Sequence, residues 1–116
     1  MATKQDVEDK LRALIRRLDG ADQGIRHSLA GSLPERRVIE VTVPDLPATY
    51  WTEMVGGRMG ALLEGSPERS DIRIRVPSDH LVELVDGRAS LFSSFVGGQV
   101  KIEASFSDLM RLRKLA

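Results

Sequence analysis

The sequence predicts an α+β domain, because strand patterns and helix patterns alternate within one short chain. Residues 71–76 and 99–104 each alternate apolar with polar side chains, which is the period of a half-buried strand. Two apolar stripes at helical spacing, separated by glycine, lie between these strands. A third alternating run, 37–43, adds another strand earlier in the chain.

The N-terminal region predicts a helix over residues 6–18. Acidic Asp6 near its start and basic Arg16 and Arg17 near its end suit the helix dipole. Carboxylates lie among its basic residues, which favours an ordinary solvated face over a membrane-binding patch. A short second helix is predicted from Ile25, ending at Gly31 or before Pro34. The apolar stripe of the first helix comprises Val7, Leu11, Leu14, Ile15 and Leu18.

The middle of the chain predicts a run of strands. Pro44 closes the strand at 37–43, and two further segments, 50–55 and 58–63, flank Gly56-Gly57. Adjacent glycines permit the positive backbone angles that a tight hairpin requires. We therefore expect a hairpin here, in a register that the sequence does not fix.

Three short helices are predicted in the last third. Ser78 is expected to cap the first, which ends at Gly87. The second carries Leu91, Phe92 and Phe95 and stops before Gly97-Gly98. Ser105 or Ser107 is expected to cap the last, whose apolar residues are Phe106, Leu109, Met110, Leu112 and Leu115. Those residues occupy more than a narrow stripe of the helix surface, so this helix should be covered on two sides or line an internal space.

Composition excludes several classes of function. The 116 residues suit one domain, 17 basic residues balance 17 acidic ones, and cysteine is absent. A chain of zero net charge lacks the basic surface typical of nucleic-acid binding. No apolar run is long enough to span a bilayer, and the first residues are too polar for a signal peptide. We therefore expect a cytoplasmic protein.

Residues suited to catalysis or metal binding are sparse. His27 and His80 are isolated in sequence and are expected at the surface, although His80 has an alternative place at the mouth of a pocket. The Gly56–Gly60 and Gly97-Gly98 segments lack the context of a phosphate-binding loop and are interpreted as turns. The sequence thus predicts neither an enzyme, nor a metal site, nor a cofactor.

The order of motifs in the last third resembles the sterol carrier protein type 2 family of lipid-binding domains. The resemblance extends more loosely over 36–64. The motifs are Ile72-Arg73-Ile74, Ser78-Asp79-His80-Leu81, Gly87, Ser94-Phe95-Val96-Gly97-Gly98, Val100-Lys101-Ile102 and the leucine-rich helix from Leu109 to Leu115.

The resemblance implies a sheet of about five mostly antiparallel strands, covered by helices, with a hydrophobic tunnel between them. Residues 1–116 would form one lipid-binding domain, with an N-terminal helical segment at 4–31 and the sheet and remaining helices at 36–115. The implied function is non-catalytic binding or transfer of a fatty acid, acyl-CoA, sterol or other lipid. Nucleic acid is not an expected partner, and membrane contact is expected to be transient at most.

We expect the tunnel wall to come from the helices of the last third and from the sheet. Spacing alone would equally suit an ordinary core, so one alternative is a protein interaction or oligomerisation module whose tunnel has collapsed. A small enzyme acting on an acyl substrate through His80 is a further alternative. The predicted wall residues are Leu81, Leu84, Val85, Phe92, Phe95, Leu109 and Leu112, with Trp51, Met54 and Met59 from the sheet.

Overall fold

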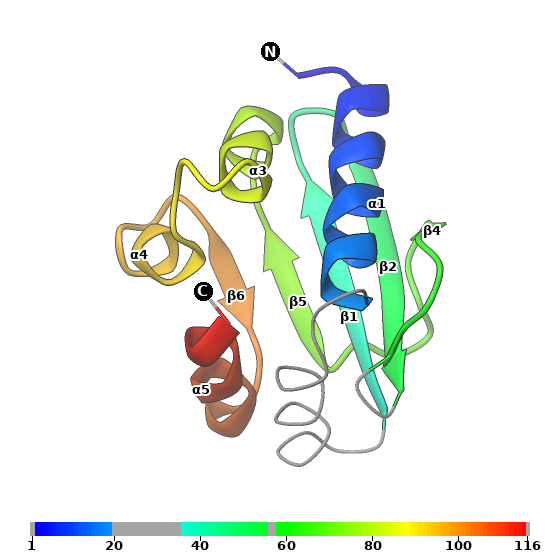
Figure 1. Ribbon diagram of the computed structural model, residues 1–116, viewed down its shortest axis with the longest axis vertical. Coiled ribbons are helices and arrows are strands. Elements are labelled where there is room, and N and C mark those ends of the chain that lie inside the picture. The colour runs from blue at the N-terminus through cyan, green and yellow to red at the C-terminus, as the bar shows by residue number, and fades with distance from the viewer. Residues whose placement is uncertain (1, 20–35, 56–57, 116) are drawn as a thin grey trace.

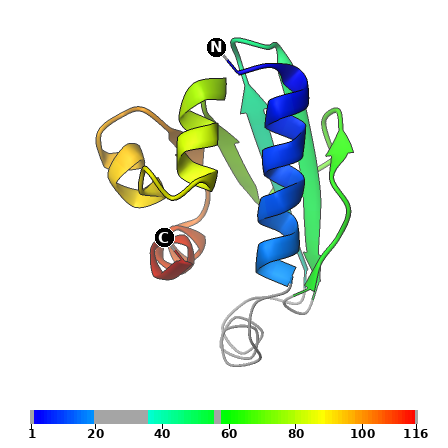
Figure 2. The same cartoon turned by 45° about the horizontal axis from the view of Figure 1, so that its top comes forward.

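The computed structural model describes residues 2–19, 36–55 and 58–115, with side chains described as far as residue 110. Its sheet is mixed, and helices α1 and α3 lie over one face of it (Figures 1 and 2). The predicted α+β class is confirmed. The predicted short helix from Ile25 lies outside the described residues.

The strands form one sheet in the order β3-β2-β1-β5-β6, with β4 also paired to β2. Strands β1 and β5 are parallel, and every other pair is antiparallel, as the expected mostly antiparallel sheet requires. The bounds are β1 Arg36–Val43, β2 Ala48–Val55, β3 Arg58–Met59, β4 Leu63–Glu64, β5 Ile72–Arg75 and β6 Lys101–Glu103.

Each helix predicted within the described residues is present. Ser105 accepts the amide hydrogen of Asp108, so Ser105 and not Ser107 caps the last helix. Gly87 adopts a left-handed φ of 78° just after α3, as expected of a residue that ends a helix. The helices are α1 Lys4–Asp19, α3 Ser78–Val85, α4 Leu91–Val96 and α5 Phe106–Leu115.

The prediction that Ser78 caps α3 is wrong. Pro77 occupies the cap position and Ser78 is the first helical residue. The Ser78 side chain and amide instead bond to the carboxylate of Asp45, which lies in the turn between β1 and β2. The cap of this helix therefore comes from a residue distant in sequence.

The strand predicted at 58–63 is divided into β3 and β4. Residue Met59 pairs with Met54, so a regular continuation would pair Leu62 with Trp51, yet Leu63 takes that position. One extra residue is thus accommodated between the two strands, as in a bulge. Gly60 lies in this segment, and a Cβ there would come within 3.2 Å of the Glu53 carbonyl oxygen.

Candidate functional site

The layer between the sheet and helices α1 and α3 is closely packed at one end. We call this end the closed half. Side chains from α1, β1, β2 and α3 meet there with little or no exposure, and Tyr50 is the largest of them. The cluster comprises Val7, Leu11, Val43, Ala48, Tyr50, Val76, Leu81 and Val100. Close packing leaves this half as the structural core.

Burial decreases toward the other end of the same layer on α1 and β1, whereas Thr52, Met54 and Ile72 on the neighbouring strands stay buried there. On α1, Val7 and Leu11 are buried, whereas Leu14 and Leu18, which continue the same stripe, are half-buried. On β1, Val43 is buried, while Ile39, which faces the same side, is half-buried. We call this end the open half, because Leu14, Leu18 and Ile39 face the layer there and keep part of their surface accessible.

Helix α5 is anchored to the sheet at the open half by a buried carboxylate. Asp108, only 3% exposed, accepts a hydrogen bond of 3.2 Å from Nε of Arg37 on β1. The Ser105 hydroxyl donates a second bond to Asp108. Arg37 faces the same side as Ile39, so this ion pair holds the start of α5 over the helix-covered face. The next residues of α5, Leu109 and Met110, are half-buried.

The predicted wall residues divide between the two halves. Leu81 and Val85 are buried on α3 and Leu84 is half-buried, with Leu81 in the core cluster. Met54 is buried and Met59 half-buried, and they pair across β2 and β3 at the open end of the sheet. The structure therefore brings Leu81 and Leu84 to the closed half and the two methionines to the open half.

The remaining predicted residues lie apart from this layer or at its edge. Phe95 and Leu109 are half-buried on the neighbouring helices α4 and α5, whereas Phe92 is exposed. Trp51 alternates with the buried Tyr50 and Thr52, so its side chain lies on the opposite face of the sheet, paired with Leu63. The side chain of Leu112 lies outside the described part of α5.

Sequence reasoning did not select the residues that define the open half. Leu14, Leu18 and Ile39 were assigned to an apolar stripe and a strand face, but nothing in the spacing separates them from core residues. The signal that identifies them is the decrease in burial along α1 and β1, which requires coordinates. Their alignment with Val7, Leu11 and Val43 is visible in the sequence alone.

His80 is half-buried and connects two helices. Its Nε2 lies 2.7 Å from the hydroxyl oxygen of Ser94 on α4, and its Nδ1 lies 3.7 Å from the Glu83 carboxylate. This order of groups resembles that of a serine nucleophile with its base. However, Ser94 is 5% exposed, and the amides of Gly97, Gly98 and Gln99 all donate to backbone carbonyls. None of these three amides is therefore available to stabilise an oxyanion, and the contact links α3 to α4.

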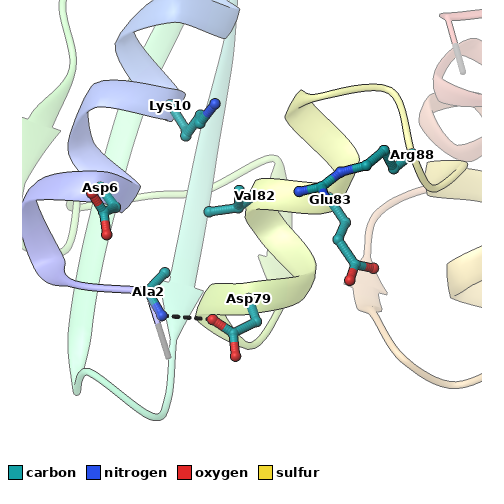
Figure 3. Close-up of a pocket in the computed structure, with 7 residues that line it drawn as sticks. All are labelled: Ala2, Asp6, Lys10, Asp79, Val82, Glu83 and Arg88. Atoms are coloured by element: carbon teal, nitrogen blue, oxygen red, sulfur yellow. Dashed lines mark hydrogen bonds between the residues drawn. The ribbon is translucent and has the colours of Figure 1, made fainter.

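A separate groove lies between α1 and α3 (Figure 3). At its rim, the backbone amide of Ala2 donates a 2.6 Å hydrogen bond to the Asp79 carboxylate on α3. All but two of its lining residues carry a charge, which suits water better than a hydrocarbon chain. The lining residues are Ala2, Asp6, Lys10, Asp79, Val82, Glu83 and Arg88.

Residues 2–19, 36–55 and 58–115 contain neither a metal-binding cluster nor a membrane-spanning helix. No group of three or more histidine, aspartate or glutamate side chains is placed to hold a metal ion there. No helix in that part of the chain is long and apolar enough to cross a bilayer.

Comparison with known proteins gives one family and a consistent fold. The model of the SCP-2 sterol transfer family matches residues 5–116, whereas no curated protein matches the chain. Among solved structures, the ubiquinone synthesis protein UbiJ-SCP2 is 14% identical with a TM-score of 0.67, covering 97% of this chain and 96% of that one. The sterol carrier protein domain 2 of Helicoverpa armigera is 16% identical with a TM-score of 0.65, covering 99% and 91% respectively.

A third similar structure is a much longer enzyme. The stereoselective inverting sec-alkylsulfatase Pisa1 from Pseudomonas sp. is 14% identical with a TM-score of 0.61. The match covers 88% of this chain but only 15% of the sulfatase. At such low identity the likeness concerns the fold of one part of that enzyme.

Proposed function

Because the chain belongs to the SCP-2 sterol transfer family, we propose that it binds and transfers a lipid or other hydrophobic molecule without catalysing a reaction on it. Family membership supports lipid binding in general. The candidates are a fatty acid, an acyl-CoA, a sterol or another lipid, and experiment must choose among them.

The observation that carries this proposal is the decrease in burial along α1 and β1 from the closed half to the open half. Leu14, Leu18 and Ile39 face the layer between sheet and helices and keep accessible apolar surface. Removing such surface from water is favourable by roughly 25 cal/mol per Å². We therefore place the hydrocarbon part of the ligand in the open half, between α1 and the sheet, with Met54, Met59 and Leu109 at its border.

The energetics permit such binding without a charged anchor. Burying about a dozen methylenes at roughly 0.8 kcal/mol each gives on the order of 10 kcal/mol. A micromolar complex needs about 8 kcal/mol, so little remains to offset ordering of the chain and the ligand. The affinity should accordingly be modest, and ligands of similar length should compete.

A second candidate function is a protein interaction or oligomerisation module with a collapsed tunnel. It is favoured by the burial of Leu81 and Val85, two predicted wall residues, which are 5% and 3% exposed. A protein of this kind would take up no lipid, and its mass by light scattering would rise with concentration.

The test is a titration of the purified, delipidated protein with a fluorescent long-chain fatty acid, followed by competition. Unlabelled fatty acid, acyl-CoA and sterol serve as competitors, and their order identifies the class of ligand. Saturable binding that is displaced supports the proposal. Absence of saturable binding by any of these lipids contradicts it and turns attention to the second candidate.

A further inference from the structure

Residues 89–100 form the longest stretch of the chain without Asp, Glu, Lys or Arg, in a protein of which 29% is charged. The stretch contains helix α4 and the turn that follows it. A basic residue borders it on each side, Arg88 before and Lys101 after, and both are exposed. An uncharged segment between two exposed cations is thus presented at the surface.

Large apolar side chains project from this region. Phe92 and Val96 lie one helical turn apart on the exposed side of α4, while Leu91, Ser94 and Phe95 turn inward. Val96 is 71% exposed, and Phe106, at the start of the neighbouring helix α5, is 76% exposed. Three of the five exposed large apolar residues in the described part of the chain therefore belong to α4 and the start of α5.

Two glycines follow the end of α4. Gly97 and Gly98 follow Val96, are exposed and carry no side chains, and Gly98 turns the chain with a φ of 83°. Helices α4 and α5 lie side by side, away from α1 (Figures 1 and 2). The two helices that carry Phe92, Val96 and Phe106 therefore lie apart from α1.

We propose that this surface, which we call the α4–α5 face, docks onto an anionic phospholipid bilayer. Apolar side chains enter the boundary between headgroups and acyl chains, and neighbouring Lys and Arg side chains bind the lipid phosphates. Lys101 is the cation that this face offers to the phosphates, because Arg88, although 65% exposed, lies 3.3 Å from the Asp86 carboxylate. Because the net charge of the chain is zero, attraction acts only at short range, so the contact is brief and weakens as salt is added.

A second copy of the chain fits the α4–α5 face less well. Two copies related by a two-fold axis would each bring the exposed Lys101 to the contact, and the only carboxylate between residues 85 and 102 is Asp86, which already pairs with Arg88. Three projecting side chains also offer less area than the roughly 1,200–2,000 Å² of a stable interface. The bilayer, which supplies both anions and an apolar interior, matches both features.

The absence of cysteine allows a direct test with a single label. Val96→Cys and, as a matched control, Val55→Cys on β2 are labelled with an environment-sensitive fluorophore. Val55 is also an exposed valine, at 44%, but lies outside the α4–α5 face. Vesicles of equal parts phosphatidylcholine and phosphatidylglycerol should increase and blue-shift the emission from position 96 and leave position 55 unchanged. No change at 96, or the same change at both, overturns the proposal.

Cosedimentation with the same vesicles tests the side chains without a label. Val96→Ser combined with Phe106→Ser should weaken binding at least tenfold, whereas Val55→Ser combined with Leu63→Ser should not. Lys101→Gln should weaken binding to the mixed vesicles, and the control Arg69→Gln in an exposed loop should not. Equal binding by both serine pairs contradicts the proposal, as does self-association through this face in the absence of vesicles. Docking requires no bound ligand, so this inference is tested separately from the proposed function.

Discussion

The carboxylate of Asp45 accepts two hydrogen bonds from Ser78, one from the backbone amide at 2.9 Å and one from the hydroxyl at 2.5 Å. Ser78 is completely buried at the first position of α3. Through this pair, the turn between β1 and β2 supplies both the cap and the negative charge that a helix N-terminus favours. The position of α3 over the sheet thus depends on Asp45.

Replacement of Asp45 should destabilise the protein. Asp45→Ala removes both acceptors and leaves the buried Ser78 amide and hydroxyl without their partner, so the thermal midpoint should fall. Asp45→Asn, which keeps one acceptor oxygen, should lower the midpoint less. Circular dichroism on heating measures both, with Glu68→Ala in an exposed loop as the control. A midpoint as high in Asp45→Ala as in the control would show that this cap contributes nothing.

Acid should destabilise the fold through three carboxylates. Hydrogen bonds lower the pKa of Asp45 through the Ser78 side chain, of Asp6 through the Thr3 amide and of Asp86 through Lys10. Because each folded pKa lies below the unfolded value of about 3.9, the stabilisation is complete above that value and is lost as pH falls through the folded pKa.

Urea unfolding over an acidic pH series measures this effect. The free energy of unfolding should fall below about pH 4, and less steeply in Asp86→Asn than in the unmodified protein. Identical slopes of the unfolding free energy against pH in the two proteins would show that Asp86 does not contribute to the acid destabilisation.

Tyr50, the only tyrosine, should resist ionisation in the folded protein. It is 1% exposed and its hydroxyl donates a 2.9 Å hydrogen bond to Glu8, and burial, followed by this bond, raises the pKa of its phenol. With the folded pKa above the unfolded value of about 10, stability should be lost as pH rises beyond that value. Tyrosinate absorbance should therefore appear together with unfolding, and ionisation without unfolding would be the contrary result. Tyr50→Phe should cost about 1 kcal/mol.

The ion pair between Arg37 and Asp108 should contribute more to the free energy of unfolding than an exposed ion pair does. Arg37→Ala removes the Arg37 cation from beside a carboxylate with 4% side-chain exposure, for an expected loss of about 2 kcal/mol or more in urea unfolding. Arg73→Ala removes one member of an exposed pair with Glu103 and should cost less than about 1 kcal/mol. Equal losses would mean that the buried pair does not anchor α5.

The periodic elements were predictable because their burial follows the sequence pattern. The stripe of α1 and the alternation of β1, β5 and β6 each specify a type of element and a buried face. The parallel pairing of β1 with β5 was not predictable, because it depends on the path of the whole chain. The cap of α3 was missed for a similar reason: Ser78 is a good local candidate, and Asp45 becomes its partner only in the folded protein.

The site was less predictable than the fold. Trp51 and Met54 differ by an odd number of positions on β2, so only one of them can face the helices. That conflict is visible in the sequence, but the face that the helices cover is not. Similarly, Leu14 and Leu18 follow the same stripe as Val7 and Leu11, and only their greater exposure distinguishes the open half from the closed half.

The most direct test of the account compares large side chains placed on the two faces of the sheet. Ile39→Trp fills the open half, whereas Leu63→Trp adds the same ring on the opposite face, and Leu18→Trp repeats the first change from α1. Titration with the fluorescent fatty acid should give at least tenfold weaker binding for Ile39→Trp and Leu18→Trp and unchanged binding for Leu63→Trp. If the fatty acid binds but both open-half variants fold and bind it as tightly as the unmodified protein, the ligand does not occupy the open half.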